Sequence, residues 1–459
     1  MTESTPVLGS RRIAASATLP GSPAEPDLPE MTVTPSRTAP DPLGRARLAR
    51  RSLFAGGAVL GTAALAGCSS SSGTTLFFHE TKSEAFPFFT QAIADFNAQA
   101  DGITVVHNKT GSLSAAFVRS SPPDVGCLNY NLEMARFMER GALIDLADME
   151  ETKRIRPDVQ DLVDEYPGFE DRVSVIPYSI MAASTIYNRT LFQEHGLEVP
   201  TTWDELLAVC EAFRSAGVTP FYATLADPWT VAQGWFDYAV GGMVDVAEFF
   251  RAMNEAGPDV TPDSEVSFSA VMREPVEKMM QLLEYINPDA ASRGYGDGNT
   301  AMAGGAGAMY LQGPWAFGEI DKVGVPTDMG TFPLPMTENP DDRKVRVNTD
   351  LALWIPEASG HHEESKALVR YLMQPDVQHP YNKEQLGFST TTDAPPAEDP
   401  RIAEMQTYYD EGRFYQGPSK FIPLMIPAEN YFQAIATGAD IGATLAQLDN
   451  DWARLAFRQ

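Results

Sequence analysis

The segment 75–128 constrains the fold of this chain most strongly, because it alternates short apolar runs with an amphipathic helix. Three apolar runs of strand length lie at 75–78, 103–106 and 125–128. Between the first two, four apolar residues recur at helical spacing: Phe86, Phe89, Ile93 and Phe96. Gly102 then ends the helix. Strand, helix and strand at this spacing predict parallel strands in an α/β sheet.

Polar residues directly follow the first and third of these apolar runs. His79 and Glu80 come after the first, and Asn129 and Tyr130 come after the third. Ligands of open α/β sheets bind at the carboxyl edge, where parallel strands end. We therefore expect these four residues close to a binding site.

The segment 50–72 is typical of an export signal. The pair Arg50-Arg51 precedes an uncharged apolar run at 53–66, which is too short for a membrane span of about 20 residues. The tetrapeptide 65–68, Leu-Ala-Gly-Cys, is similar to a bacterial lipobox, which implies a lipid on Cys68 and cleavage before it. The arginine pair is similar to a twin-arginine signal, or is a chance pair in an ordinary secretory signal. We expect a protein that is lipid-anchored to the outer face of the cytoplasmic membrane.

The composition divides the chain into a leader and a mature part. Residues 1–44 hold eight prolines and no lysine, so we expect 1–67 to be a disordered leader followed by the signal peptide. The serine-rich stretch 68–75 predicts a flexible tether. The remainder of the 459 residues is long enough for two domains.

Net charge restricts the partners of the chain. The formal net charge of −28 at pH 7 repels phosphate, so we expect no nucleic-acid partner. It also disfavours anionic lipid and an anionic solute. Since acidic residues are spread over the whole chain, the charge indicates solubility more than a particular site.

Two cysteines remain after Cys68. Cys127 ends an apolar run and Cys210 lies on the apolar face of an expected helix that begins after Thr202 and carries Glu205 as a capping box. Both positions favour buried free thiols, with a disulfide between them as the alternative.

Several short motifs follow one another in an order that resembles a known family. They are Pro123-Asp124-Val125, Gly141-Ala142-Leu143, Ile186-Tyr187-Asn188, Thr202-Trp203-Asp204-Glu205, Gly217-Val218-Thr219-Pro220, Gly313-Pro314-Trp315 and Phe332-Pro333-Leu334-Pro335. Each motif alone is weak, but their common order is not expected by chance. The chain resembles the extracellular solute-binding proteins of bacterial carbohydrate ABC importers, the group that contains maltose-binding protein.

This resemblance implies a type II periplasmic-binding-protein-like α/β fold with a ligand cleft between two lobes. It implies two or three crossovers, which we expect near 178–183 and 346–350. One lobe would comprise 76–180 and 351–388, and the other 181–350 and 389–459. The implied function is capture of a carbohydrate and its delivery to the permease subunits of an ABC importer, without catalysis, cofactor or metal.

A sugar site needs aromatic rings for the C–H faces and fixed polar groups for the hydroxyls. The resemblance and the turn before it make Trp315 the first stacking candidate, with an inter-lobe core position as the alternative. The other expected aromatic residues are Phe317, Trp229 and Tyr178. The expected polar residues are Glu80, Asn129, Asp227, Asn348 and Asp350.

Two other functions stay open at this point. An exported glycoside-processing enzyme would use a pair of carboxylates, and acidic residues are too numerous to exclude one. The same fold could also bind a polyol or a cationic solute. The glycine-rich stretch 294–298 lacks a preceding strand, so it predicts a loop and not a nucleotide site.

Overall fold

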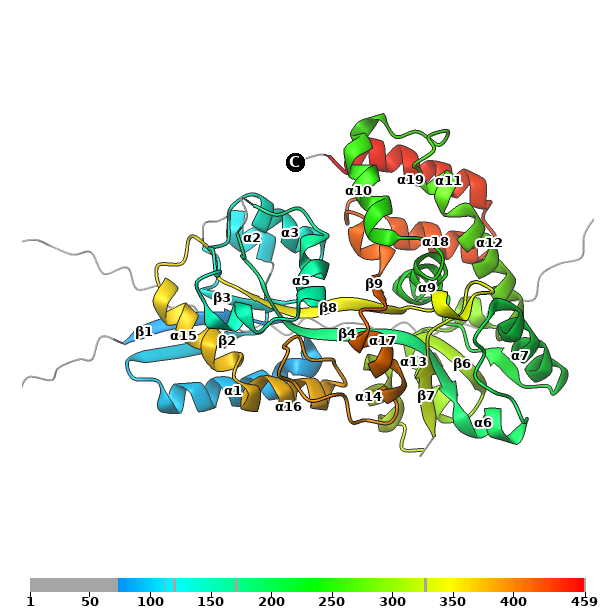
Figure 1. Ribbon diagram of the computed structural model, residues 1–459, viewed down its shortest axis with the longest axis horizontal. Coiled ribbons are helices and arrows are strands. Elements are labelled where there is room, and N and C mark those ends of the chain that lie inside the picture. Colours follow the sequence, from blue (N-terminus) through cyan, green and yellow to red (C-terminus); the bar gives the residue numbers. More distant parts are fainter. Residues whose placement is uncertain (1–72, 112, 119–120, 170–171, 326–327, 458–459) are drawn as a thin grey trace, which may run out of the picture. The chain divides into compact units, whose positions relative to one another are not determined.

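The computed structural model describes residues 73–111, 113–118, 121–169, 172–325 and 328–457 (Figure 1). All of them belong to one compact unit that spans 69–459. The predicted signal peptide, the lipidation of Cys68 and most of the tether lie outside the described residues. In the described part of the chain, no helix is both long and apolar enough to span a membrane.

The strands form a mixed sheet in the order β2-β1-β3-β8-β4-β6-β5, with β7 paired to β4 and β9 to β8. The strand bounds are β1 Thr74–His79, β2 Ile103–Asn108, β3 Val125–Leu128, β4 Ile176–Asn188, β5 Thr219–Phe221, β6 Gly307–Gln312, β7 Met329–Phe332, β8 Val345–Trp354 and β9 Phe414–Gln416. β1 pairs in parallel with both β2 and β3. The predicted α/β class and its first three strands are therefore confirmed.

Helices surround this sheet. Their bounds are α1 Phe86–Gln99, α2 Leu113–Val118, α3 Leu132–Glu139, α4 Glu150–Lys153, α5 Pro157–Asp164, α6 Arg189–Glu194, α7 Trp203–Ser215, α8 Pro228–Thr230, α9 Asp237–Gly241, α10 Val246–Ala256, α11 Phe268–Val271, α12 Arg273–Leu282, α13 Tyr295–Ala303, α14 Trp315–Lys322, α15 His362–Leu372, α16 Pro375–Gln385, α17 Gln406–Asp410, α18 Ala428–Ala436 and α19 Ile441–Leu455. As predicted, Thr202 caps α7 by accepting a hydrogen bond from Glu205 N at 3.3 Å.

The two long strands β4 and β8 run side by side through the middle of the sheet (Figure 1). They pair antiparallel, with Met181 opposite Asn348 and Ala183 opposite Arg346. Past this point β4 continues alone into pairing with β6 and β7. Both expected crossovers therefore fall on strands that link the part of the sheet around β1 with the part around β6.

The hydrophobic core consists of two clusters, one on each face of the sheet. Consecutive residues of β8 show this, because Leu353 belongs to one cluster and Trp354 to the other. On β4, Ile180 and Ala183 are divided in the same way. Helices α1 and α16 lie on one side of the β4–β8 pair, and α3 and α9 on the other (Figure 1). The central strands are thus buried along their whole length.

Two local predictions have different outcomes. Cys127 and Cys210 are both buried free thiols, as expected. The loop predicted at 294–298 is wrong, because α13 begins at Tyr295. Gly294 N donates to Asp297 Oδ2 at 2.9 Å, so an acidic side chain in the first turn stabilises the helix start that the glycines alone would disfavour.

Candidate functional site

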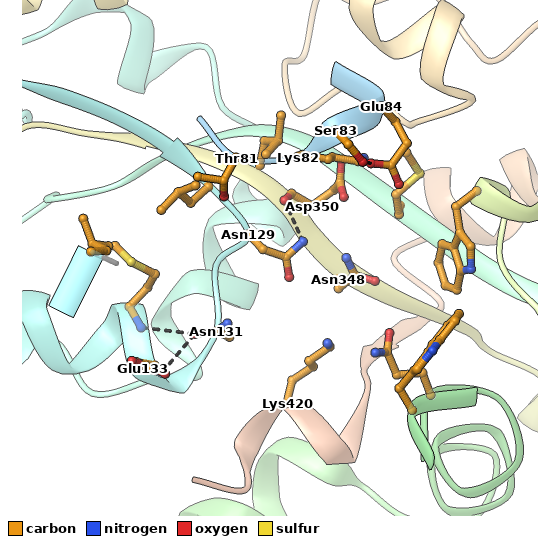
Figure 2. Close-up of a pocket in the computed structure, with 18 of the residues that line it drawn as sticks. Thr81, Lys82, Ser83, Glu84, Asn129, Asn131, Glu133, Asn348, Asp350 and Lys420 are labelled. Carbon is orange, nitrogen blue, oxygen red and sulfur yellow. Dashed lines mark hydrogen bonds and ion pairs between the residues drawn. The ribbon is translucent and has the colours of Figure 1, made fainter. Parts of the chain in front are cut away.

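A cavity of about 940 Å³ lies over the middle of β8 (Figure 2). Its walls come from segments far apart in the sequence, and its volume lies within the range of small-molecule sites. The lining residues are Thr81, Lys82, Ser83, Glu84, Leu113, Leu128, Asn129, Asn131, Glu133, Met134, Phe137, Met181, Trp229, Gln233, Tyr295, Trp315, Glu319, Lys322, Asn348, Asp350, Leu351 and Lys420. We refer to this cavity as the central pocket.

Aromatic side chains form one wall of the central pocket. Trp229, near the start of α8, packs edge-on against Tyr295 with 5.0 Å between ring centroids. Trp315 begins α14, and its indole donates from Nε1 to Gln312 Oε1 at 3.2 Å. Both tryptophans are only partly buried, so apolar ring surface remains available to a ligand.

The turn before α14 fixes the position of the Trp315 ring. A Cβ atom at Gly313 would lie 2.1 Å from the indole, so only glycine allows the ring to lie over this backbone. The Gly-Pro-Trp motif therefore has a steric reason. It places an indole at the pocket wall, where the ring also packs against both core clusters.

Polar groups of β8 and of the loops after β1 and β3 form the opposite wall. Asp350 forms an ion pair with Lys82, with 2.7 Å between Oδ2 and Nζ. Asn129 donates from Nδ2 to the carbonyl oxygen of Asp350 at 2.8 Å. This bond uses the amide NH₂ of Asn129 and leaves its Oδ1 as an acceptor toward the pocket (Figure 2).

A buried network of charged groups lies next to the central pocket and contacts two segments that line it. Arg346 and Asp237 form an ion pair at 3.0 Å with no exposed side-chain surface. Arg346 Nη1 also donates to Asn348 Oδ1 at 2.7 Å. Asp237 accepts from Ser419 N at 2.8 Å and from Ser419 Oγ at 2.9 Å. One network therefore orients Asn348 and fixes the chain segment that carries Lys420.

Lys420 points from the short helix Pro418–Phe421 toward Asn348 and Asn129 (Figure 2). Its Nζ makes no hydrogen bond or ion pair with any described residue. The pKa of Lys420 is lowered to about 8, mainly by burial and then by the charge of Arg346, while Asp237, Glu429 and Asp350 act to raise it.

The structure brings together five of the nine residues predicted for ligand contact. Trp229, Trp315, Asn129, Asn348 and Asp350 all line the central pocket. Of the four residues expected close to a binding site from their position after the first and third strands, only Asn129 lines the central pocket. His79 and Tyr130 are buried and do not line the central pocket.

The other four predicted residues do not line the central pocket. Phe317 is buried in a core cluster, since α14 turns it away from Trp315, and Arg401 stacks on its ring. Tyr178 is buried against Phe89 and Tyr381.

The two acidic residues among the four have structural partners instead. Glu80 is fully buried, accepts a hydrogen bond from the backbone N–H of Lys82 and lies 3.4 Å from His107 Nε2. Asp227 accepts a hydrogen bond from Tyr295 N at 2.7 Å. Asp227 therefore helps to fix the backbone of Tyr295, which belongs to the aromatic wall.

The sequence interpretation missed Lys420, Lys82 and Tyr295. Lys82 follows β1 by three residues, so the same carboxyl-edge argument could have found it. Lys420 lies outside any recognisable motif and reaches the pocket only through tertiary contacts. Among the described residues, no group of three or more potential metal ligands is present.

A central sheet flanked by helices, with an aromatic and polar pocket at its linking strands, defines an α/β binding protein of the two-lobe type. Comparison with known proteins agrees. The sequence profile described as bacterial extracellular solute-binding protein matches residues 80–379. The chain belongs to this family.

The similar proteins include binding proteins of several bacteria and an archaeon. An uncharacterized ABC transporter extracellular-binding protein of Pyrococcus horikoshii is 28% identical over 49% of this chain and 49% of its own length. A multiple sugar-binding protein of Streptococcus mutans is 27% identical over 44% of this chain and 47% of its own length. The chain thus spans about half the length of the curated relatives it matches.

Solved structures share the fold over most of the chain. The apo form of RafE from Streptococcus pneumoniae superimposes with a TM-score of 0.73 at 21% identity, covering 83% of this chain and 98% of the other. RafE in complex with raffinose gives a TM-score of 0.69 at 22% identity, covering 83% and 100%. At these identities the comparison supports the fold alone.

Proposed function

We propose that this protein is the binding component of a carbohydrate ABC importer and captures its sugar in the central pocket. The proposal is supported mainly by one observation: tryptophan side chains and amide side chains line the same cavity. Trp229 and Trp315 offer ring faces for sugar C–H surfaces, and Asn129 and Asn348 offer amide groups for hydroxyls. Several similar proteins are named as sugar-binding, which supports the same ligand class.

A thermal-shift panel of mono- and oligosaccharides tests this function. A ligand at 100 times its Kd stabilises the folded state by about 2.7 kcal/mol. We expect at least one sugar to raise Tm, and the panel should include raffinose and stachyose, since related folds bind them. The absence of a shift with every sugar would contradict the proposal. The same mixtures, analysed by chromatography, should contain intact sugar, whereas cleavage products would favour a glycoside-processing enzyme.

We further propose that the two lobes comprise 76–180 with 351–388 and 181–350 with 389–459, and that they close on the ligand. Support comes from β4 and β8, which link the two parts of the sheet. A ligand that contacts both lobes binds the closed form better and shifts the population toward it. Small-angle scattering should give a smaller radius of gyration with saturating sugar, and an unchanged radius would count against closure.

The proposed location is the outer face of the cytoplasmic membrane, with a lipid on Cys68. The family description supports an extracytoplasmic location, and the lipobox at 65–68 supports the anchor. Cys68→Ser should release the protein from the membrane fraction, because lipid provides the only proposed attachment. Continued membrane association of this variant would contradict lipid anchoring.

A further inference from the structure

The central pocket contains one cation that its other charges do not neutralise. Lys82 is paired with Asp350 at 2.7 Å, and Lys322 with Glu319 at 2.6 Å. Lys420 alone among the three pocket lysines has no carboxylate within ion-pair distance in the described part of the chain.

The acidic groups near Lys420 do not compensate it. Asp237 is committed to Arg346 at 3.0 Å, and Asp350 is committed to Lys82. Glu429 is the remaining acidic neighbour, and it forms no ion pair with Lys420 in the part of the chain that the structure describes. The residue is exposed as a whole, but partial burial raises the pKa of its carboxyl, which Lys420 opposes. Arg346, also nearby, repels the ammonium. A partly buried, unpaired ammonium is unfavourable until an anion reaches it.

The other two acidic residues that line the pocket do not cancel this charge. Glu84 and Glu133 lie on exposed positions of other elements, where water screens them. Lys420 is instead withdrawn from solvent beside two oriented amides. Because Asn348 Oδ1 accepts from Arg346, its Nδ2 is left as a donor, and Asn129 Oδ1 is left as an acceptor.

We propose that the ligand is an acidic carbohydrate, a sugar carrying a uronic acid carboxylate, and that Lys420 Nζ and Asn348 Nδ2 bind that carboxylate. A neighbouring sugar hydroxyl then donates to Asn129 Oδ1. A single unpaired ammonium matches the single charge of a carboxylate better than the two charges of a phosphate ester. This inference rests on the proposed carbohydrate function and names its substrate class. It differs from the expectation, drawn from net charge alone, that anionic solutes are disfavoured.

Calorimetry with matched sugars tests the assignment. Each uronic acid is titrated beside its neutral parent: glucuronate with glucose, galacturonate with galactose, and trigalacturonate with galactotriose. For at least one pair at pH 7 we expect the acidic member to bind about tenfold or more tightly, as for a desolvated charge pair. Glucose 6-phosphate serves as the dianionic comparison and should bind more weakly than the preferred uronic acid.

The variant Lys420→Met removes the charge and keeps the length of the side chain. We expect it to abolish the preference for the acidic sugar, because it weakens binding of the uronic acid by about tenfold more than binding of the neutral parent. The matched control is Lys153→Met, since this lysine is 62% exposed, is already paired with Glu150 and does not line the central pocket, and the preference of this variant should be unchanged. A ligand-free melt should show that neither variant is unfolded.

The pH dependence gives a second readout. A bound carboxylate raises the pKa of Lys420 above its free value of about 8. Affinity for the uronic acid should therefore be constant below about pH 7.5 and fall as pH rises through 8 and above. In Lys420→Met the affinity should not change over this range.

Three outcomes overturn the inference while the proposed function stands. They are tighter binding of every neutral parent, equal weakening of both members by Lys420→Met, and tighter binding of the phosphate ester. If no sugar of either kind binds, the proposed function fails as well.

Discussion

The guanidinium of Arg346 donates to Asn348 Oδ1 at 2.7 Å while it forms a fully buried ion pair with Asp237. Asn348 lies on the linking strand β8, so a core charge network orients a pocket amide directly. Gly417 allows this close approach, because a Cβ atom there would lie 2.7 Å from Arg346 Nε. A buried charge pair and a pocket amide are therefore joined in one hydrogen-bonded network.

Removing one member of this pair should destabilise the protein strongly. Asp237→Ala leaves the Arg346 charge buried without its partner, which costs about 3–5 kcal/mol of unfolding free energy in comparable pairs. Urea denaturation without ligand measures this. The control Glu248→Gln removes one partner of the surface residue Arg251, which is 57% exposed, and should change stability by less than about 0.5 kcal/mol.

The double variant Asp237→Leu/Arg346→Met separates stability from binding. Apolar replacement of both charges should recover much of the lost stability, since buried pairs rarely exceed a well-packed apolar pair. Sugar affinity should stay low, because Asn348 and Ser419 lose their anchors. Full recovery of affinity would show that the network does not orient the pocket.

Trp315→Ala should weaken sugar binding by about 2–4 kcal/mol, as for an aromatic binding hot spot. The ring is only partly buried, so the stability loss should be smaller than for a core tryptophan. Trp452→Ala is the matched control, because Trp452 is 1% exposed and should cost about 3–5 kcal/mol of stability. A Trp315 variant that melts much earlier but keeps its affinity would make Trp315 structural.

Gly313→Ala should displace the Trp315 ring without removing it. The added Cβ would meet the indole at 2.1 Å, so we expect about tenfold weaker sugar binding, a loss of about 1.4 kcal/mol. The control is Gly318→Ala within α14, where a Cβ atom meets nothing within 4 Å. That variant should bind normally and gain a few tenths of a kcal/mol in stability, on the order expected for glycine in a helix. Equal affinities of the two variants would contradict the steric role of Gly313.

Stability should also depend on the ionisation of Glu165. Burial raises the pKa of Glu165 from 4.5 to about 7, although Gln416 Nε2 donates to its carboxyl at 3.2 Å. The folded state then holds a proton that the unfolded chain has lost, so this residue lowers the free energy of unfolding as pH rises from about 4.5 to 7. Glu165→Gln should abolish this loss and be more stable at pH 8 by up to about 2 kcal/mol. If the free energy of unfolding changed with pH in the same way for the wild-type protein and for Glu165→Gln between pH 5 and pH 8, this assignment would be contradicted.

Local patterns were sufficient to predict several elements, but not the helix that begins at Tyr295, and only part of the pocket. The strands β1–β3 and the cap at Thr202 follow from apolar spacing and side-chain chemistry within a few residues. Asn129 follows from the rule that loops after parallel strands share one edge. Phe317 shows the limit of this reasoning, because the helical turn after Trp315 decides which of two nearby aromatic residues faces the pocket. Lys420 was not predictable, since contacts between distant parts of the chain bring its segment to β8: β9 pairs with β8, and Ser419 donates to Asp237.

Calorimetric titration of the double variant Trp315→Ala/Asn348→Ala tests the central claim most directly, with the sugar that raises the wild-type Tm most. The wild-type protein should bind one sugar per chain, and the double variant should lose about 3 kcal/mol or more of binding free energy. Its ligand-free urea midpoint should show that it remains folded. Unchanged affinity and stoichiometry in a folded double variant would contradict binding in the central pocket.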